Sequence, residues 1–372
     1  MENKNFEKKN NIVFFISSLG GGGAEGVCVS LANAMAKRGW QVNLLVLNLN
    51  NALHQTTLDP LVNLVSLNVQ HTRNAIFPLK RYIRNNKPDK FLVFNYELAV
   101  LLVLLRGWLN SDYKIIARNI NSLRSKQQQV QSLWRKCIVY PLIHRLYYKV
   151  DFVINQCCAM QEELISLYPQ ISSKSVVIYN PVNTHILEAA KNTPSLFIKK
   201  GGYLLCVGRL EKQKAFHLAI EGFAILAEDF PTLKLKILGE GRLENELKLL
   251  AVNLNIQDRV DFVGYQKNMI PFYQNANATV LTSLYEGFPN VLVESITLGT
   301  PVIAFDCQSG PGEIIEEGVN GCLVKSRDIH ALATAIKTIL TTPPSQELVQ
   351  HNTDKYDIEN IVVLYEKVLL TQ

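Results

Sequence analysis

Arg209 and Lys214 lie in a short segment of the second half of this 372-residue chain, with Lys212 between them. They follow an apolar run and precede an amphipathic stretch, so they would lie in a strand-to-helix loop. Fixed cations in such a loop could neutralise a diphosphate leaving group, because guanidinium and ammonium groups bind phosphate oxygens strongly. The plain alternative is a solvated loop with two ordinary cations, and the segment taken alone favours that alternative.

A second segment contains two carboxylates eight residues apart, Glu286 and Glu294. Pro289 suits the first position of a helix, so the backbone amides of Gly287 and Phe288 would lie at a helix start. Carboxylates accept hydrogen bonds from the vicinal hydroxyls of a sugar or a ribose. Apolar residues surround Glu294, so a merely solvated glutamate is less expected there. The segment predicts a site for a sugar or a nucleoside.

A third segment places Ser309 and Gly310 between a predicted strand and a predicted helix. The hydroxyl of Ser309 or the amide of Gly310 could hold a phosphate, and the plain alternative is a turn with Glu313 near the helix start. All three segments follow strands of one predicted parallel sheet. Because the carboxyl ends of parallel strands share one edge of a sheet, we expect the segments to meet there.

Four consecutive glycines, Gly20 to Gly23, join the first predicted strand to the first predicted helix. Glycines let a ligand approach the backbone, and a helix start favours phosphate. Three interpretations remain: a dinucleotide site, a phosphate and acceptor site for a nucleotide sugar, and a tight turn without a ligand. A dinucleotide site needs an acidic residue after the second strand, and residues 47–51 contain none. This lowers the case for a dehydrogenase.

Composition and charge predict two globular domains. Apolar residues make up 48% of the chain and charged residues 19%, which excludes a disordered or fibrous protein. Residues 1–184 hold 21 basic and 10 acidic residues, a net +11, and residues 185–372 hold 17 and 22, a net −5. Such an asymmetry suggests domains with different partners.

Short apolar runs alternate with helical patterns in both halves, which predicts α/β domains with doubly wound parallel sheets. The expected strands are 12–16, 42–47, 61–67, 91–94, 114–117, 152–155, 176–178, 203–207, 234–238, 260–263, 278–281, 302–305 and 322–324. The expected helices include 24–38, 215–229, 244–253, 289–298, 329–340 and 357–370. The expected divisions are an N-terminal acceptor-binding domain 1–183, a linker 184–202, a nucleotide-sugar-binding domain 203–352, and a C-terminal helix 353–372 that could pack back on the first domain.

The cysteines and the apolar runs indicate a reducing compartment. None of the seven cysteines forms a CxxC pair, so a zinc site is not expected. The longest apolar run, residues 98–105, is far shorter than the roughly 18 residues of a spanning helix, and the apolar run at the start is too short for a signal peptide. We expect a cytoplasmic protein.

Several motifs occur in order: GGGGAEGVCVSLANAMAKRG, VGRLEKQK, LGEGRLENEL, SLYEGFPNVLVES and SGPGEI. Together they resemble the retaining GT-B glycosyltransferases of family four, the glycosyl transferases group 1, of the bacterial cell-surface polysaccharide or lipopolysaccharide type. The resemblance covers nearly the whole chain, is strongest over residues 202–324 and is weakest over 52–110. It implies two Rossmann-like domains that face each other across a cleft.

The resemblance also assigns expected roles to residues. Glu286, Lys214 and Arg209 would be catalytic, with the two cations holding the diphosphate and Glu286 holding the transferred sugar. The donor-binding residues would be Glu294, Gly287, Phe288, Pro289, Asn290, Gly239, Gly241, Tyr265, Ser309 and Gly310. Gly21, Gly22 and Gly23 would face the donor phosphate and the acceptor. The candidates for acceptor binding are Arg118, Asn119, Asn95 and Glu97.

Three positions depart from the family pattern: Ala215 stands where Gly is usual, Gly26 where Arg is common, and Gly312 where a larger residue is frequent. No Asp-x-Asp motif occurs in the sequence. Since such carboxylates typically hold the metal of a metal-dependent transferase, we expect no metal and no other cofactor, with cations and helix starts stabilising the leaving group.

Residues 114–150 contain eight Lys and Arg residues and no Asp or Glu. Trp134, Tyr140, Tyr147 and Tyr148 are interleaved, which predicts basic amphipathic helices on an anionic membrane surface. Nucleic-acid binding fits the charge alone and lacks a motif, so it is not expected. The remaining alternative is a solvated basic helix whose aromatic residues belong to the core.

The resulting hypothesis is a retaining glycosyltransferase at the inner face of the cytoplasmic membrane. It would move a hexose or an N-acetylhexosamine from a UDP-sugar to a lipid-linked oligosaccharide or a lipopolysaccharide or polysaccharide precursor. Two alternatives remain open: a GT-B sugar-nucleotide epimerase, and a non-catalytic sugar-nucleotide-binding scaffold of a membrane glycan assembly.

Overall fold

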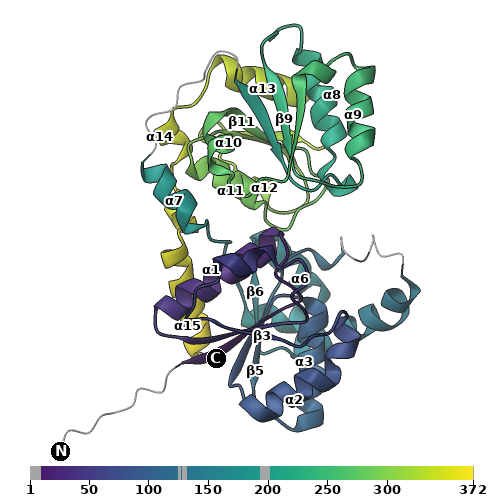
Figure 1. The fold of residues 1–372 in the computed structure, drawn as a ribbon, viewed down its shortest axis with the longest axis vertical. Coiled ribbons are helices and arrows are strands. Elements are labelled where there is room, and N and C mark those ends of the chain that lie inside the picture. The colour runs from purple at the N-terminus through teal and green to yellow at the C-terminus, as the bar shows by residue number, and fades with distance from the viewer. Residues whose placement is uncertain (1–9, 125–126, 128–131, 193–201, 372) are drawn as a thin grey trace, which may run out of the picture. The chain divides into compact units, whose positions relative to one another are not determined.

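The computed structural model describes residues 10–124, 127, 132–192 and 202–371. The chain splits into two compact units. The first comprises Met1–Pro181 together with Ile358–Gln372, and the second comprises Val182–Asp357. Each unit contains one parallel sheet covered by helices (Figure 1).

The sheet of the first unit has seven parallel strands in the order β3-β2-β1-β4-β5-β6-β7. The strands are β1 (Asn11–Ile16), β2 (Gln41–Val46), β3 (Asn63–Ser66), β4 (Lys90–Val93), β5 (Lys114–Arg118), β6 (Phe152–Asn155) and β7 (Ser175–Val177). The central strands are apolar on both faces, because helices cover both sides of a doubly wound sheet.

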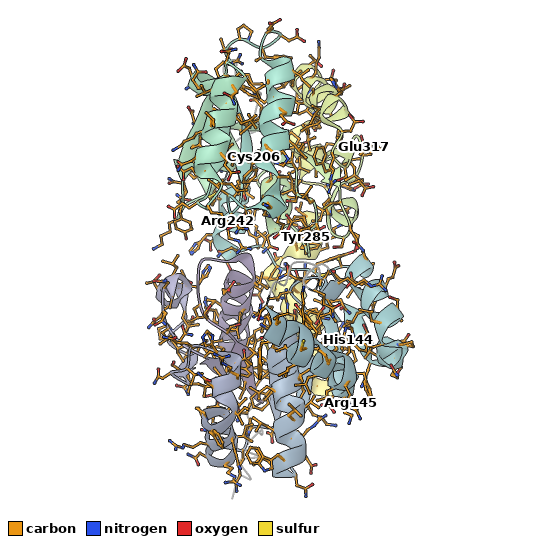
Figure 2. All side chains as sticks on the ribbon, turned by 90° about the vertical axis from the view of Figure 1, so that its right-hand side faces the viewer. His144, Arg145, Cys206, Arg242, Tyr285 and Glu317 are labelled. Carbon is orange, nitrogen blue, oxygen red and sulfur yellow. The ribbon has the colours of Figure 1, made fainter. Side chains whose placement is uncertain are left out.

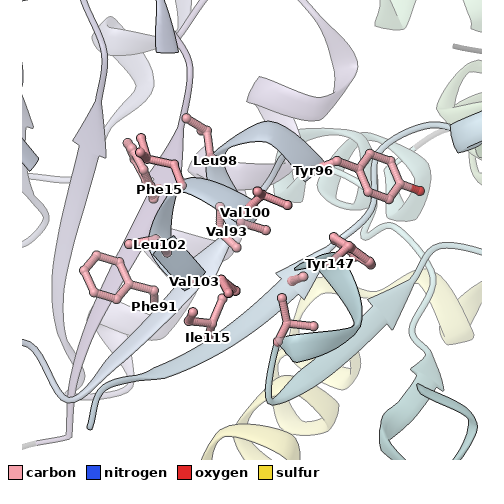
Figure 3. Packing of buried hydrophobic residues seen from close by; sticks show 14 of the residues in the cluster. Phe15, Phe91, Val93, Tyr96, Leu98, Val100, Leu102, Val103, Ile115 and Tyr147 are labelled. Atoms are coloured by element: carbon pink, nitrogen blue, oxygen red, sulfur yellow. The ribbon is translucent and has the colours of Figure 1, made fainter. Parts of the chain in front are cut away.

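The helices of the first unit are α1 (Gly23–Lys37), α2 (Ile76–Asn86), α3 (Tyr96–Leu109), α5 (Tyr140–Leu146), α6 (Cys158–Leu167) and α15 (Ile358–Thr371). Short turns of tighter helix lie at Leu53–Thr57, Thr72–Ala75, Tyr147–Lys149 and Pro169–Lys174, and a wider π turn lies at Arg135–Val139. Side chains of α2, α3, α5 and α6 form one core cluster with the central strands. Figure 3 shows part of this cluster, in which Phe15, Phe91 and Ile115 from three strands lie beside Val100 and Leu102 of α3.

The last helix, α15, packs against α1 within the first unit (Figure 1). The carboxylate of Glu366 accepts hydrogen bonds from the Arg38 guanidinium at 2.8 Å and from Trp40 Nε1 at 2.9 Å, and these contacts hold the pKa of Glu366 below its usual value. The hydroxyl of Tyr365 accepts a hydrogen bond from Arg118 Nε at 2.7 Å. The chain therefore returns to the first unit to complete it.

The sheet of the second unit has six parallel strands in the order β10-β9-β8-β11-β12-β13. They are β8 (Tyr203–Val207), β9 (Lys234–Leu238), β10 (Val260–Gly264), β11 (Ala276–Leu281), β12 (Val302–Asp306) and β13 (Gly321–Lys325). The helices are α7 (Thr184–Lys191), α8 (Phe216–Leu226), α9 (Glu244–Asn253), α10 (Ile270–Asn275), α11 (Asn290–Thr297), α12 (Pro311–Ile314), α13 (Ile329–Thr341) and α14 (Gln346–Val349). Short 3-10 turns lie at Lys212–Lys214, Gln257–Arg259 and Thr353–Tyr356.

The predicted fold class, α/β with two doubly wound parallel sheets, is confirmed. The segment expected as a linker, 184–202, begins with α7, whose start is capped by the Asn183 side chain. The rest of that segment, from 193 to 201, lies outside the described residues. The units divide at Pro181 and again at Asp357, just before α15.

Candidate active site

Three loops of the second unit lie together because their strands are neighbours. β8, β11 and β12 are adjacent and parallel, so the loops that follow them share one edge of the sheet. Hydrogen bonds join these loops: Leu284 N donates to Gln213 O at 2.8 Å, and the side-chain Ser309 Oγ donates to Glu286 O at 2.6 Å. The structure thus brings together the three segments that the sequence singled out.

Lys214 and Glu286 form an ion pair at the centre of these loops. Lys214 Nζ lies 2.6 Å from Glu286 Oε1, and their side chains are 16% and 8% exposed. Gly208 explains how the lysine reaches this place, because a Cβ there would lie 2.9 Å from Lys214 Cε. The two groups are held in a largely water-excluded setting, where a fixed charge acts strongly on a developing charge.

Arg209, the second predicted cation, lies in the same loop and is exposed. Among the described residues none forms an ion pair with it, whereas the nearby Glu211 pairs with Arg242 at 2.9 Å. Arg209 is therefore a cation available to an anionic ligand, and Lys214 is already paired.

Glu294 lies in α11 and accepts a hydrogen bond from the hydroxyl of Tyr273 at 2.8 Å. Burial raises the pKa of the Glu294 carboxyl to about 7, and the hydrogen bond from Tyr273 acts in the opposite direction. Burial also raises the pKa of Tyr273 well above its usual value, so its hydroxyl stays a donor. The carboxyl of Glu294 changes charge near neutrality, unlike a solvated glutamate.

Tyr273 is a residue that sequence analysis missed. It lies in the short helix α10 and is fully buried, and no motif marks it. Its backbone carbonyl also accepts a hydrogen bond from Thr300 Oγ1 at 2.7 Å. Tyr273 thus fixes the Glu294 carboxyl relative to the sheet.

Two predicted donor-binding glycines allow strand-end loops to approach each other closely. A Cβ at Gly239, whose φ is +128°, would lie 2.0 Å from Gly208 O, and a Cβ at Gly241 would lie 2.5 Å from Leu210 O. The packing of backbone on backbone accounts for both residues. Their predicted contact with a nucleoside stays a prediction.

The remaining predicted donor residues surround the ion pair or lie along the same edge. Gly287, Phe288 and Pro289 are buried directly before α11, and Asn290 begins that helix. Gly310 has φ +92°, and a Cβ there would lie 2.6 Å from Pro289 Cδ, so it lets two of the loops pack together. Tyr265 follows the edge strand β10 and is 49% exposed.

The glycine loop of the first unit leads directly into α1. Gly21, Gly22 and Gly23 are exposed, and Gly22 precedes the helix with φ −86°, in the extended region. The loop therefore does not need glycine for a left-handed backbone. A Cβ at Gly22 would lie 2.3 Å from Glu25 Oε2, so Glu25 folds back over the loop. Gly22 therefore makes room for the Glu25 side chain in an exposed loop at a helix start.

The predicted acceptor residues of the first unit are buried or make contacts within that unit. Arg118 and Asn119 are 1% and 2% exposed. Asn95 caps α3 by accepting a hydrogen bond from Glu97 N at 2.8 Å, and Glu97 lies 3.3 Å from Arg135 in an ion pair. Their predicted contact with an acceptor stays a prediction.

Residues 114–150 include both buried and exposed side chains. Within this range, 125–126 and 128–131 lie outside the described residues. Tyr140 and Tyr147 are buried in the core, so the expectation that they face a membrane was wrong, because both pack in the cluster under α5. Arg118 is buried as well. The exposed apolar residues are Leu133, Trp134, Ile138 and Leu142, and the exposed cations near them are Arg135, Lys136, Arg145 and Lys149. Figure 2 shows His144 and Arg145 on this part of the first unit.

Each half of the chain matches a glycosyltransferase family model. The model described as Glycosyltransferase Family 4 matches residues 21–186. The model described as Glycosyl transferases group 1 matches residues 189–356, the half that holds the Lys214–Glu286 pair. Both models describe glycosyltransferases, so the chain is a glycosyltransferase whose residues 189–356 match group 1.

Two relatives show how far the similarity of this glycosyltransferase extends. It is 31% identical over 252 residues to an uncharacterized glycosyltransferase of Methanocaldococcus jannaschii, in a match that covers 64% of this chain and 61% of the relative. It is 27% identical to the N-acetylgalactosamine-N,N'-diacetylbacillosaminyl-diphospho-undecaprenol 4-alpha-N-acetylgalactosaminyltransferase of Campylobacter jejuni, over 88% of this chain and 89% of that protein.

The crystal structure of Anabaena HepE in complex with UDP and glucose is similar in fold. Its TM-score is 0.77, with 19% identity over 98% of this chain and 100% of that one. The GT-B fold of this glycosyltransferase is thereby confirmed. Among the described residues, no helix combines the length and the apolar character that a membrane crossing requires.

The departures from the family pattern have local explanations in this glycosyltransferase. Ala215 has φ +44° and ψ +43°, a left-handed conformation that glycine adopts more readily. A Cβ at Gly26 would lie 3.3 Å from the His54 ring, so the imidazole occupies the space beside it. Around Gly312 the nearest atom to a Cβ would be Leu323 Cδ2 at 3.7 Å, which leaves room for a side chain.

Proposed function

We propose that this glycosyltransferase is a retaining enzyme that moves a hexose or an N-acetylhexosamine from a UDP-sugar to a lipid-linked oligosaccharide or to a lipopolysaccharide or polysaccharide precursor. The observation that carries the proposal is the Lys214–Glu286 pair, at 2.6 Å, where three strand-end loops meet. The name of the Campylobacter relative, which transfers N-acetylgalactosamine to a diphospho-undecaprenol-linked saccharide, supports this acceptor class. The UDP and glucose in the complex of the similar HepE agree with a UDP-sugar donor.

In the proposed reaction, the bond between the anomeric carbon and the diphosphate oxygen breaks, and a bond to the acceptor oxygen forms on the same face. The acceptor proton moves to the departing phosphate oxygen, so neither a protein nucleophile nor a separate base is needed. Arg209 and Lys214 stabilise the charge that develops on the leaving diphosphate. The products are the glycosylated acceptor and UDP.

Glu286 has two roles in this proposal. Before the donor binds, its carboxylate neutralises Lys214 and keeps the buried ammonium paired, because an unpaired buried charge is costly. When the diphosphate arrives, Lys214 turns to the phosphate, and Glu286 accepts hydrogen bonds from the hydroxyls of the transferred sugar. Glu294 in α11 accepts those of the ribose.

We propose no divalent metal requirement, since cations of this chain hold the diphosphate. Turnover in excess EDTA tests this part. Persistent activity is expected, and a loss of activity that magnesium or manganese restores would overturn it.

Residues 132–149 are proposed as the contact with an anionic membrane at the inner face of the cytoplasmic membrane. Leu133 and Trp134 are 76% and 48% exposed, next to Arg135 and Lys136. Apolar side chains among cations suit the headgroup layer of an anionic bilayer. The lipid-linked acceptor of the proposal would be reached from this surface.

The decisive experiment incubates the purified protein with UDP-sugars and an extract of undecaprenyl-linked acceptors. A new glycoside with the donor's anomeric configuration, identified by mass spectrometry and NMR, is expected. Conversion of the UDP-sugar into its epimer without an acceptor would indicate the epimerase alternative. Tight donor binding without any turnover would indicate the scaffold alternative.

A further inference from the structure

A second exposed apolar surface lies on α2 and α3 of the first unit. Phe77, Leu104 and Trp108 are 72%, 45% and 57% exposed. The rings of Phe77 and Trp108 meet edge to face, with centroids 6.4 Å apart and planes at 72°. Leu104 and Trp108 are four residues apart, so they share a face of α3. We call Phe77, Lys80, Leu104 and Trp108 the α2–α3 platform.

The platform is cationic as well as aromatic. Lys80 Nζ lies 3.4 Å from the centroid of the Trp108 ring, a cation–π contact. Arg81 and Arg84 follow Phe77 by four and seven residues, so they lie on the same side of α2. Residues 60–88 contain five Lys and Arg residues and no Asp or Glu. A contiguous exposed apolar patch marks an interaction site, and the cations beside this one favour an anionic partner.

A groove of about 630 Å³ connects the α2–α3 platform with residues 132–149. Its lining includes Leu104 and Trp108 of the platform and Leu146 and Lys149 of residues 132–149. Two carboxylates also line the groove, Asp112 and Asp151, and the latter is ion-paired with Arg106.

Two strands of the first unit's sheet show at which end of that sheet the groove lies. Lys114, which begins β5, and Asp151, which directly precedes β6, both line it. The groove therefore lies at the amino ends of these strands. Ligands of doubly wound sheets bind at the carboxyl ends, so the platform is a docking surface rather than part of an acceptor pocket.

We propose that the α2–α3 platform inserts Phe77 and Trp108 into the headgroup layer of an anionic bilayer, as a second membrane contact beside residues 132–149. Aromatic rings next to cations suit this layer, where one end of the side chain meets water and the other meets lipid. The inference rests on the proposed function only in its choice of a bilayer as the partner.

On both surfaces, the charged and the apolar side chains should respond differently to salt. The attraction of exposed cations for anionic lipid fades as the Debye length falls to about 3 Å at 1 M salt. Burial of Phe77 and Trp108 does not depend on charge and persists in high salt. The platform therefore supplies the salt-resistant part of membrane binding, together with Leu133 and Trp134.

Vesicle sedimentation tests the platform. The platform variant, which combines Phe77→Ser and Trp108→Ser, is compared with the wild type and with a matched control. The control combines Leu249→Ser and Val252→Ser on α9, where the two side chains are 61% and 51% exposed. On vesicles of phosphatidylcholine with phosphatidylglycerol, the platform variant should partition about tenfold more weakly at high salt, from the lost apolar burial. The control should bind like the wild type, and circular dichroism verifies folding. Equal partition of all three proteins, or no vesicle binding by the wild type at low salt, would overturn the proposal.

Tryptophan fluorescence gives an independent readout. Trp134→Phe keeps Trp108 as an exposed tryptophan, and Trp108→Phe is its matched counterpart. With anionic vesicles, emission from the Trp134→Phe protein should move to shorter wavelength and be quenched by lipids with brominated chains. An unchanged spectrum of that protein would contradict insertion of Trp108.

Two further measurements separate this inference from the proposed function. Transfer to a detergent-dispersed acceptor should be the same for the platform variant and the wild type, and a loss there would place the platform in the acceptor site and overturn the membrane role. A concentration-dependent dimer in sedimentation velocity that the platform variant loses, without any vesicle binding, would identify a second copy as the partner instead. Vesicle binding without any glycosyl transfer would contradict only the proposed function.

Discussion

The carboxyl edges of the two sheets use polar residues in opposite ways. In the second unit, the edge carries a charged pair, Lys214 and Glu286, and a titratable carboxyl, Glu294. In the first unit, the edge carries Arg118 and Asn119 in a buried network of amides and hydroxyls, in which Tyr147 OH donates to Asn119 Oδ1 at 2.6 Å.

The network of the first unit leaves one donor unused. Arg118 donates to Tyr365 and to the Asn180 side chain, but its buried Nη1 finds no acceptor in the described part of the chain. Its guanidinium lies 5.2 Å from the centroid of the Phe94 ring. These contacts tie β5 to α15, so this edge stabilises the unit. The edge of the second unit thus carries the charged groups that the proposed reaction uses, whereas the edge of the first unit holds distant segments of the chain together.

The largest expected effect concerns the charged edge. Lys214→Ala should lower kcat by about 10² to 10³, because it removes a fixed cation from the leaving diphosphate. Lys212→Ala, an exposed lysine of the same loop, is the matched control and should keep the wild-type rate. Steady-state kinetics measures both. If kcat fell by less than about tenfold in a folded Lys214→Ala protein, Lys214 would not stabilise the leaving group.

Arg118 provides the opposite test. Arg118→Met should lower the free energy of unfolding by about 1–3 kcal/mol, because it leaves buried partners unsatisfied, while the dissociation constant for UDP stays unchanged. Urea denaturation and calorimetric titration give the two quantities. Should the variant keep its stability and lose transfer to the acceptor, Arg118 would be an acceptor-binding residue and the comparison would fail.

The pH dependence of the donor KM tests whether Glu294 binds the donor. Its pKa of about 7 is raised above the usual value, so the carboxyl is largely protonated at pH 6 and largely ionised at pH 8. An ionised carboxylate is the stronger acceptor for ribose hydroxyls, so the donor KM should fall by up to about tenfold over that range.

Two variants test the assignment of this pH dependence. Glu294→Gln should raise the KM and remove the dependence. Tyr273→Phe removes the hydrogen bond that lowers the pKa, so the midpoint should move to higher pH. A pH profile that survives in the Glu294→Gln protein would show that another group titrates.

Much of the fold could be predicted from the sequence, because apolar runs on both faces of a strand are a strong signal. Every expected strand occurs in the structure within about two residues, and 152–155, 203–207 and 234–238 occur with the predicted bounds. The missed features depend on contacts between distant segments. Residues 98–105 appeared only as an apolar run, yet they form the centre of α3. The sequence predicted a C-terminal helix that could pack back on the first domain, but not its contacts with Arg38 and Arg118, which no local pattern connects to it.

In the candidate site, too, some residues could be predicted from motifs and others depend on contacts between distant segments. The Lys214–Glu286 pair belongs to segments with strong motifs, so it could be anticipated as one cluster. Tyr273 could not, because its role comes from its distance to Glu294 and not from its neighbours in the sequence. Burial of Arg118 was likewise invisible, since a strand-end arginine looks the same whether it faces a ligand or a core.

The smallest expected effect concerns Ala215, which directly follows Lys214. An L-residue in the left-handed region costs about 1–2 kcal/mol, and Ala215 has φ +44°. Glycine relieves this strain but makes the unfolded chain more flexible, which costs about 0.4–1 kcal/mol. Ala215→Gly should therefore raise the free energy of unfolding by roughly 0.5 kcal/mol, whereas Ala224→Gly, inside α8, should lower it by about 1 kcal/mol. Urea denaturation compares the two variants. The methyl group of Ala215 is 1% exposed. If Ala215→Gly were the more destabilising of the two variants, packing of this methyl group would stabilise the protein by more than the backbone strain destabilises it.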